Sequence, residues 1–548
     1  MSQPLSHLLV VPIVLPLLTT AGLLLLGTTR RRFKARLNVL STLAGLIVAV
    51  TLLWHVDHSG AIDVYLASNW EAPFGIVLVA DRLSALMLVL TGMVSLCAAL
   101  YAEAAWARAG AYFHPLFQLQ IMGLNGAFLT GDFFNLFVFF EVMLVASYGL
   151  QLHGSGWPRV RSGLHYIAVN LLASSLFLVG VAVLYGVAGT LSMADLGAAV
   201  ARVPASERGL LHAGAAILAM AFLIKAAIWP LNSWLVPAYT AASAPVAALF
   251  ALMTKVGVYA LLRSWTLLFS DDAGPSLNFG KPVLLYGGFA TIAFGALGLL
   301  ASMRLGRIAS FSIIVSSGTL LAALGVGAPS VTSAALFYML SATLAVSALF
   351  LLVEVIERIG VGGRALPDDD DAPGSDTNLD DQELPLVGRE FPMSITLLGL
   401  SFMSCAVIVA GLPPLSGFIA KFSLMAAVLR VEDTRAAGGD LSFAAWALVA
   451  LLLASGLAFS MSLAKAGIRH FWSMGSRFTA QLRGVEAVAV LALLVSCVLL
   501  TVWAEPVMRY TGATAAVLHT PSAYIEAVSA RKARPGPPPS KPEREGSP

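Results

Sequence analysis

Long apolar runs recur along the whole chain, separated by short breaks that contain charged residues, proline or glycine. A helix needs about 20 apolar residues to cross a bilayer, and most of these runs reach that length. Alternating polarity, the mark of membrane barrel strands, is absent from the sequence. The pattern therefore predicts an all-α polytopic membrane protein with about fourteen transmembrane helices. The predicted spans are residues 5–27, 36–56, 77–102, 113–131, 133–153, 163–188, 211–232, 243–268, 282–303, 308–327, 329–356, 393–429, 441–464 and 486–504.

The composition excludes a water-soluble globular protein. Of the 548 residues 58% are hydrophobic and only 11% are charged, whereas soluble proteins have about 25% charged residues. The net charge of +3 is too small to indicate nucleic-acid binding. Cys97, Cys405 and Cys497 lie far apart in apolar runs, and the sequence has no Gly-rich phosphate loop. We therefore expect no metal site, no cofactor and no soluble catalytic domain.

Basic residues predict the orientation, because loops rich in Lys and Arg stay on the cytoplasmic side. The first apolar run is followed by five basic residues within 30–36, which are placed inside, so the N-terminus lies outside. Alternation then puts most later basic loops inside and the acidic loops 57–76 and 270–280 outside. The basic, Pro-rich tail 531–548, which is expected to be disordered, would lie outside; either long tails escape the rule or the span count is off by one. The acidic segment 364–390 is expected to be a solvated inner loop.

Four charged residues lie within the predicted spans: Glu141, Lys225, Lys255 and Lys421. Each costs roughly 2.5–3.5 kcal/mol at mid-membrane depth, so the four together ask for a function. Static ion pairing is the alternative explanation. One acid cannot neutralise three lysines, however, and Lys225 and Lys255 lie too far from their span ends for their side chains to reach water comfortably.

The chemistry of lysine favours a proton path through these positions. A buried lysine gives up its proton more readily than an exposed one, and a nearby carboxylate favours the protonated form. Arginine effectively never deprotonates, so it can hold charge but cannot relay a proton. Of the eight lysines three lie within spans, while the more numerous arginines lie almost wholly in loops and at span ends.

Two of these spans are interrupted by helix-breaking residues. Pro230 and Pro237 follow Lys225, and Pro413, Pro414 and Gly417 precede Lys421. Proline leaves backbone carbonyls unpaired, which a membrane tolerates only where protein or water satisfies them. Broken helices at corresponding positions of two halves are typical of inverted-repeat transporters. Two unrelated packing kinks remain the alternative.

Weaker polar positions accompany the charges. Ser316, Ser317, Ser341 and Thr343 could hold water along a path, or could be small residues that allow close helix packing, and the sequence does not separate the two. Asp132, before the Glu141 span, is explained by helix capping at least as well as by ion uptake.

The segments GDFFNLFVFFEVMLVASY, FLIKAAIWPLNSWL, ALFALMTKVGVYALLR and GLPPLSGFIAKF closely resemble the proton-conducting antiporter-like subunits of respiratory complex I, membrane-bound hydrogenases and multisubunit Mrp-type antiporters. The resemblance covers about residues 80–465 and is best to the D-type subunits of the Mrp antiporters. It implies two inverted five-helix repeats at 111–270 and 281–465, after an N-terminal three-helix region at 1–110 and before a final span and tail at 466–548. It also implies that Glu141 pairs with Lys225, that Lys255 bridges the halves and that Lys421 ends the path.

Two departures from the family pattern stand out. The family usually has His or Lys in the span near 336–350, where this chain offers only Ser341, Thr343 and Ser347, so the middle of the relay is expected to rest on water. The stretch LVPAYTAASAP after Trp234 also differs from its relatives, which puts the geometry of the first break in doubt.

The sequence thus predicts a proton-translocating subunit of a multisubunit Na⁺ or K⁺/proton antiporter in the bacterial plasma membrane. It is a transporter subunit rather than an enzyme, and its expected partners are homologous antiporter-like subunits. A proton-pumping subunit of a complex I-like NADH:quinone oxidoreductase or of a membrane-bound hydrogenase is the alternative. A third hypothesis is a structural subunit that transports nothing.

Overall fold

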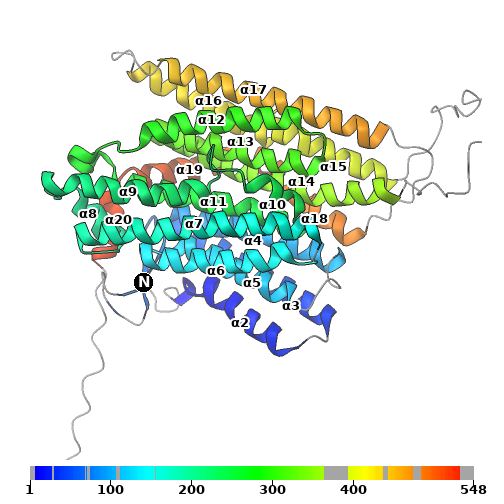
Figure 1. Ribbon diagram of the computed structural model, residues 1–548, viewed down its shortest axis with the longest axis horizontal. Helices are drawn as coiled ribbons and strands as arrows, with labels where there is room; N and C mark the ends of the chain where they lie inside the picture. Colours follow the sequence, from blue (N-terminus) through cyan, green and yellow to red (C-terminus); the bar gives the residue numbers. More distant parts are fainter. Residues whose placement is uncertain are drawn as a thin grey trace, which may run out of the picture.

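The computed structural model of the protein describes residues 7–27, 30–67, 70, 75–105, 112–154, 156–362, 393–435, 442–472 and 483–530. Figure 1 shows its long helices running roughly parallel, from α2 at one edge of the bundle to α17 at the other. The predicted class of helical membrane protein is confirmed, whereas the expectations for 364–390 and 531–548 fall outside the described residues. The elements are α2 (Val11–Leu25), α3 (Arg31–Ser59), β1 (Asp63–Leu66), β2 (Val77–Ala80), α4 (Arg82–Ala105), α5 (Phe113–Leu129), α6 (Phe133–Leu152), α7 (Trp157–Ala188), α8 (Met193–Val200), α9 (Ala205–Lys225), α10 (Leu235–Ala241), α11 (Ala244–Leu268), η2 (Asp271–Ser276), α12 (Lys281–Ala301), α13 (Leu305–Val326), α14 (Pro329–Gly362), α15 (Met393–Ala410), α16 (Ser416–Arg435), α17 (Ser442–Gly467), η5 (Ile468–Trp472), α18 (Gly484–Val502), α19 (Ala504–Leu518) and α20 (Pro521–Ser529).

Twelve helices in the described part of the chain are long and apolar enough to cross a membrane. Helices also occupy the predicted spans 5–27 and 113–131, but α2 has 15 residues and α5 has 17. The predicted span 393–429 consists of two helices, α15 and α16, separated by a short gap. The number of helices that cross the bilayer and the division into inverted repeats therefore remain predictions.

Three helices form the core of the bundle. The most apolar stretches of α11 and α13 are completely buried and that of α14 is 94% buried, whereas the corresponding stretch of α3 is only 28% buried. Outer helices such as α3, α7 and α12 expose apolar side chains on their free faces, as lipid-facing helices do. A charged side chain on α11 therefore lies among protein atoms rather than in lipid.

The two proline-containing interruptions are real gaps in helices. Helix α9 ends at Lys225 and α10 begins ten residues later, while α15 ends at Ala410 and α16 begins at Ser416. Each gap contains a cis peptide bond, at Trp229–Pro230 and at Pro413–Pro414. In the first gap the backbone N–H of Trp229 donates to Thr291 of α12 at 2.9 Å, which satisfies one group that the missing helix turn leaves free.

Pro237 and Gly417 lie near the start of the half-helix that follows each break, α10 and α16. Pro237 occupies the first turn of α10, where a helix has no use for the missing N–H. Gly417, the second residue of α16, faces the carbonyl of Ile408 on α15 so closely that a Cβ atom would clash with it. The glycine thus permits the two halves of the broken helix to cross in contact.

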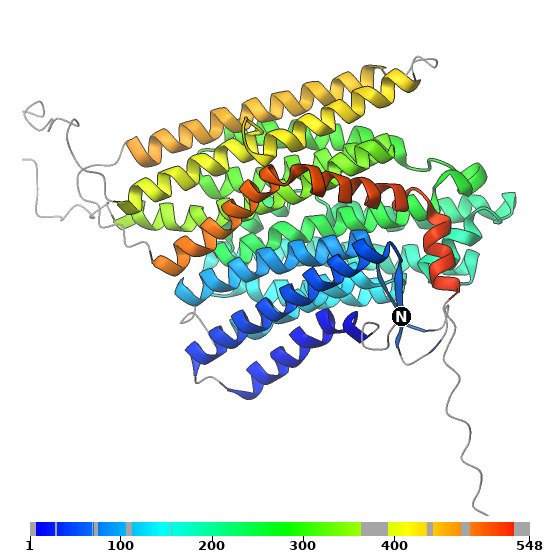
Figure 2. The same cartoon turned by 180° about the vertical axis from the view of Figure 1, so that it is seen from behind.

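One end of the bundle carries elements that the hydrophobic pattern did not predict. β1 and β2 pair as an antiparallel hairpin with Asp63 opposite Ala80. β1 lies in the expected outer loop 57–76, whereas β2 takes the first residues of the predicted span 77–102, whose helix begins only at Arg82. Beyond the last predicted span, α19 packs along α14 and α20 packs against α8 and β1. Figure 2 shows α19 lying across the face of the bundle and α20 turning beside the hairpin. The C-terminal region is therefore helical as far as residue 529.

Candidate functional site

Lys225 lies at the end of a half-helix rather than in the middle of an unbroken one. It is the last residue of α9, it is buried, and its Nζ atom has no hydrogen-bond partner among the described residues. The ammonium group lies 5.1 Å from the centre of the Phe140 ring on α6. The next residue on α6 is Glu141, whose carboxylate is close enough to interact electrostatically with Lys225. The acid and the first lysine of the predicted relay thus lie near each other, but among the described residues no direct ion pair joins them, and Oε1 of Glu141 is also without a hydrogen-bond partner.

Lys255 lies in the middle of α11, one of the two helices whose most apolar stretches are completely buried. Its residue is 2% exposed, and Nζ donates a hydrogen bond of 2.8 Å to Oγ of Ser316 on α13. Two residues further on, Gly257 packs directly on the end of α9, where a Cβ atom would lie 2.7 Å from the backbone nitrogen of Ala226. The helix of Lys255 therefore crosses the first break beside Lys225.

Lys421 is bound at the second break. It lies in the second turn of α16, is buried, and donates a hydrogen bond of 2.9 Å to the carbonyl oxygen of Ala410. Ala410 is the last residue of α15, so this carbonyl belongs to the group that a helix end leaves without an intrahelical partner. The Lys421 ammonium also lies 5.6 Å from the centre of the Phe459 ring on α17.

The four serine and threonine positions separate into two pairs. Ser316 and Ser341 line a cavity of about 10 Å³ enclosed by α13, α14, α15, α16 and α17, whereas Ser317 and Thr343 do not. Thr343 donates to the carbonyl of Met339 in its own helix, and the Ser317 hydroxyl is buried without a partner in the described part of the chain. A cavity of this volume holds about one water molecule. Ser316 and Ser341 thus lie where water can bind along a path.

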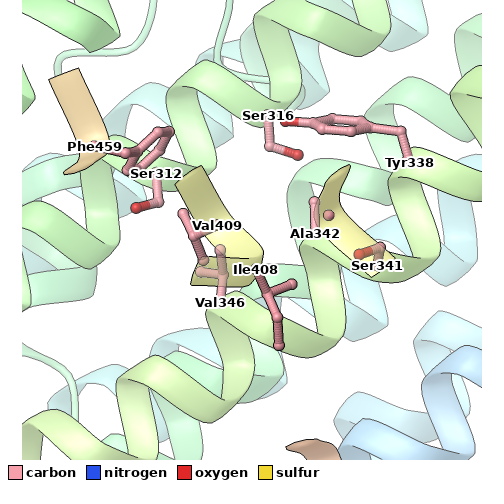
Figure 3. Close-up of a pocket in the computed structure, with 10 residues that line it drawn as sticks. Ser312, Ser316, Tyr338, Ser341, Ala342, Val346, Ile408, Val409 and Phe459 are labelled. Atoms are coloured by element: carbon pink, nitrogen blue, oxygen red, sulfur yellow. The ribbon is translucent and has the colours of Figure 1, made fainter. Parts of the chain in front are cut away.

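Sequence reasoning missed Tyr338 and Ser416. Tyr338 of α14 lines the same cavity (Figure 3), and its hydroxyl lies near the hydroxyls of Thr319 and Ser316 on α13. Ser416, the first residue of α16, shares a hydrogen bond of 2.9 Å with Ser341. Tyr338 precedes Ser341 by three residues and so shares its helix face, which is a signal that the sequence did contain.

A carboxylate at the N-terminal end of α11 was also missed. Glu354 of α14 is half-buried, and its Oε2 accepts a hydrogen bond of 3.0 Å from the backbone N–H of Ala244, at the start of α11. Arg159 of α7 interacts electrostatically with Glu354 and donates at 2.9 Å to the carbonyl of Ala241, at the end of α10. The pair therefore ties α7, α10, α11 and α14 together below Lys255.

An ion pair holds the opposite end of α11. Arg263 donates to Asp81 at 2.7 Å, and its guanidinium lies 5.1 Å from the Tyr524 ring of α20. Burial opposes ionisation of Asp81, but Arg263 and hydrogen bonds with Ser84 together hold the pKa of the Asp81 carboxyl below its ordinary value. Asp81 precedes α4, so the pair joins the hairpin, α11 and the C-terminal helices.

The expectation for Asp132 has a clear structural outcome. Asp132 accepts a hydrogen bond of 2.9 Å from the backbone N–H of Asn135 and is thus the N-cap of α6. Burial raises the pKa of this carboxyl above its ordinary value. No group of three or more potential ligands capable of holding a metal ion occurs within the described residues.

The family of the chain follows from comparisons with known proteins. Residues 130–438 match the family model of the NADH:quinone oxidoreductase/Mrp antiporter transmembrane subunits. The chain therefore belongs to this family of ion-translocating membrane proteins. Within it, the chain is 48% identical to the D-type subunit of a probable K⁺/H⁺ antiporter of Rhizobium meliloti, over 96% of this chain and 98% of the relative. It is 33% identical to the D-type subunit of an Na⁺/H⁺ antiporter of Alkalihalophilus pseudofirmus, over 95% and 99%.

Solved structures lead to the same family. A chain of the Mrp complex from a Dietzia species superimposes with a TM-score of 0.80 at 29% identity, over 96% of this chain and 100% of the other. A chain of respiratory complex I from Thermus thermophilus superimposes with a TM-score of 0.72 at 21% identity, over 94% and 99%, which shows a shared fold. The predicted resemblance to antiporter-like subunits, best to the D-type subunits of Mrp antiporters, is confirmed.

Proposed function

We propose that this protein is the proton-translocating subunit of a multisubunit Na⁺ or K⁺/proton antiporter of the Mrp type in the bacterial plasma membrane. The observation that carries the proposal is the series Glu141, Lys225, Lys255 and Lys421 in the interior of one helical bundle. Two of the three lysines lie at breaks in helices, and the third lies on α11, a core helix whose most apolar stretch is completely buried. The names of the relatives, which are D-type antiporter subunits, support the same conclusion.

In this mechanism protons pass along the lysines in order. Glu141 stabilises the protonated form of Lys225 at the first break, Lys255 connects the two halves through Ser316, and Lys421 ends the series at the second break. Because each lysine is buried, the charge on one affects the next. At an effective dielectric constant of about 20, two unit charges about 10 Å apart interact by about 1.7 kcal/mol, which changes a protonation ratio more than tenfold.

Each of the two proposed units of the chain contains one of the broken helices. The first unit comprises residues 111–270 and contains the break between α9 and α10, and the second comprises residues 281–465 and contains the break between α15 and α16. Each unit holds a lysine beside its break. Movement of the cation is coupled to these protonation changes, in partnership with homologous antiporter-like subunits of the same complex.

The test is cation/proton exchange in everted vesicles that contain the assembled complex. Glu141→Ala and Lys225→Ala are expected to abolish exchange while the complex still assembles. Lys465→Ala, at an exposed lysine of α17, is the matched control and retains exchange. Unchanged exchange in the first two variants would instead indicate a structural subunit.

Electron donors separate the antiporter from a redox-driven pump. The proposed antiporter exchanges protons for Na⁺ or K⁺ in vesicles that receive neither NADH nor a quinone. Proton movement that requires an electron donor and ignores both cations would contradict the proposal. Comparing Na⁺ with K⁺ in the same vesicles identifies the cation.

A further inference from the structure

We propose that the hydroxyl groups of Ser316, Tyr338, Ser341 and Ser416, with water in the cavity between them, carry protons from Lys255 to Lys421. Tyr338 is the essential member of this hydroxyl bridge. The inference rests on the proposed function and adds to it the route through the middle of the protein, where the chain has no charged side chain on the span 336–350.

The bridge begins at Lys255. Its ammonium donates to Oγ of Ser316 at 2.8 Å, and the Tyr338 hydroxyl, which lines the same cavity as Ser316, lies near that serine and near Thr319. Lys255 lies on α11, Ser316 on α13 and Tyr338 on α14, so three core helices meet at this contact. All three residues are buried, which leaves these groups little alternative to bonding with one another.

The cavity continues the bridge toward the second break. Ser316 and Tyr338 lie on one side of it, and Ser341 lies one turn further along α14. Figure 3 shows the Tyr338 ring extending toward Ser316, with Ser341 and Ala342 nearby. Ser341 shares a hydrogen bond of 2.9 Å with Ser416, the first residue of the half-helix that carries Lys421.

Lys421 lies next to the far wall of the same cavity. Phe459 and Gly417 line the cavity, and Phe459 is also the ring that the Lys421 ammonium faces at 5.6 Å. The cavity therefore has the serine bonded to Lys255 at one side and the ring that the Lys421 ammonium faces at the other. A water molecule in the cavity completes the proposed path.

Hydroxyl groups suit this task because each can donate and accept a hydrogen bond. A hydroxyl oxygen accepts the incoming proton while its own proton passes to the next oxygen, so one O–H bond forms as another breaks. No charge stays on the bridge after transfer. A titratable side chain is therefore unnecessary between the two lysines.

Tyr338 differs in this respect from another buried tyrosine. Tyr239 donates its hydroxyl proton to the backbone carbonyl of Phe250 at 2.9 Å, and a carbonyl cannot donate in return. The polar groups near the Tyr338 hydroxyl include the hydroxyls of Thr319 and Ser316, and a hydroxyl can both donate and accept. Tyr239→Phe thus removes a buried hydroxyl of equal size without interrupting the bridge and is the matched control.

The experiment measures exchange in proteoliposomes that contain the whole complex, with assembly checked by the yield of purified complex. Tyr338→Phe is expected to slow exchange by about tenfold without changing the half-saturating cation concentration, whereas Tyr239→Phe leaves exchange unchanged. Ser316→Ala is expected to have a similar effect. The double variant should be no slower than the slower single variant, because both changes interrupt one path.

Each outcome decides between the two proposals. Full exchange in Tyr338→Phe or in Ser316→Ala, or additive effects in the double variant, would overturn the hydroxyl bridge. Loss of exchange in Lys255→Ala alongside unchanged Tyr338→Phe would remove the bridge and leave the proposed function standing. Unchanged exchange in Lys255→Ala would count against the proposed function itself. If Tyr338→Phe fails to assemble, Ser316→Ala and Ser341→Ala decide the question.

Discussion

The ammonium of Lys421 donates a hydrogen bond of 2.9 Å to the carbonyl oxygen of Ala410, the last residue of the preceding half-helix. The break thus supplies a partner for the lysine, because a continuous helix would have used that carbonyl itself. The negative end of the α15 dipole also favours a positive charge at this position. The prolines end α15 and so leave the Ala410 carbonyl free to accept the hydrogen bond of Lys421.

Replacing Lys421 by arginine separates charge from proton transfer. Lys421→Arg keeps a positive charge near the Ala410 carbonyl, but a guanidinium does not release its proton. We expect the complex to assemble and exchange to fall by about a hundredfold. Exchange assays with Lys465→Arg as the control check this, and normal exchange in Lys421→Arg would show that only the charge matters.

Gly257 is expected to be intolerant of a side chain. In Gly257→Ala the new Cβ atom would lie 2.7 Å from the nitrogen of Ala226 and 2.9 Å from the carbonyl oxygen of Phe222, both backbone atoms that cannot turn aside. Such overpacking costs about 1–3 kcal/mol of stability. Thermal unfolding of the purified complex measures the loss. Gly186→Ala on α7, where the added Cβ has open space, should not destabilise the protein, and equal unfolding temperatures would refute the prediction.

Glu354 is expected to stabilise the N-terminal end of α11. Glu354→Gln keeps an oxygen that can accept from the N–H of Ala244 but removes the negative charge near Arg159 and the helix N-terminus. We expect a loss of about 1–2 kcal/mol in thermal unfolding, in line with charges at partly buried helix ends. Glu505→Gln breaks an exposed ion pair with Arg509 and serves as the control, for which little change is expected. Comparable losses in the two variants would contradict this role.

The pair between Asp81 and Arg263 predicts a specific dependence of stability on pH. The pKa of Asp81 is lowered in the folded protein, so its contribution is present above the unfolded value of about 3.9 and is lost as pH falls through the lowered value. Asp81→Asn leaves Arg263 without a counter-charge, at a cost of about 3–5 kcal/mol.

The measurement is the unfolding temperature of the purified complex between about pH 3 and pH 7. The difference between the original protein and Asp81→Asn should be constant near neutral pH and shrink below about pH 4. A difference that persists unchanged in acid would mean that the carboxylate charge is not responsible.

The sequence predicted much of the fold because membrane helices depend on local composition. Long apolar runs placed nearly every helix, and the prolines near 230 and 413 placed both gaps. The hairpin of β1 and β2 and the helices α19 and α20 were missed. They are short or less apolar elements, stabilised by contacts with distant segments such as α8 and α14, which no local pattern reveals.

The amino-acid sequence by itself determined that this is a helical membrane protein with an acid and three lysines where lipid-compatible residues are expected, because a buried charge is conspicuous in any apolar run. It did not determine what each lysine touches. Only the tertiary structure decided that Lys255 bonds to Ser316 and that Lys421 bonds to the end of a half-helix. It also decided that Tyr338 lines a cavity beside Ser316 and that Ser416 bonds to Ser341. Serine and tyrosine are ordinary in helices, so their chemistry emerges only when packing brings their hydroxyls together.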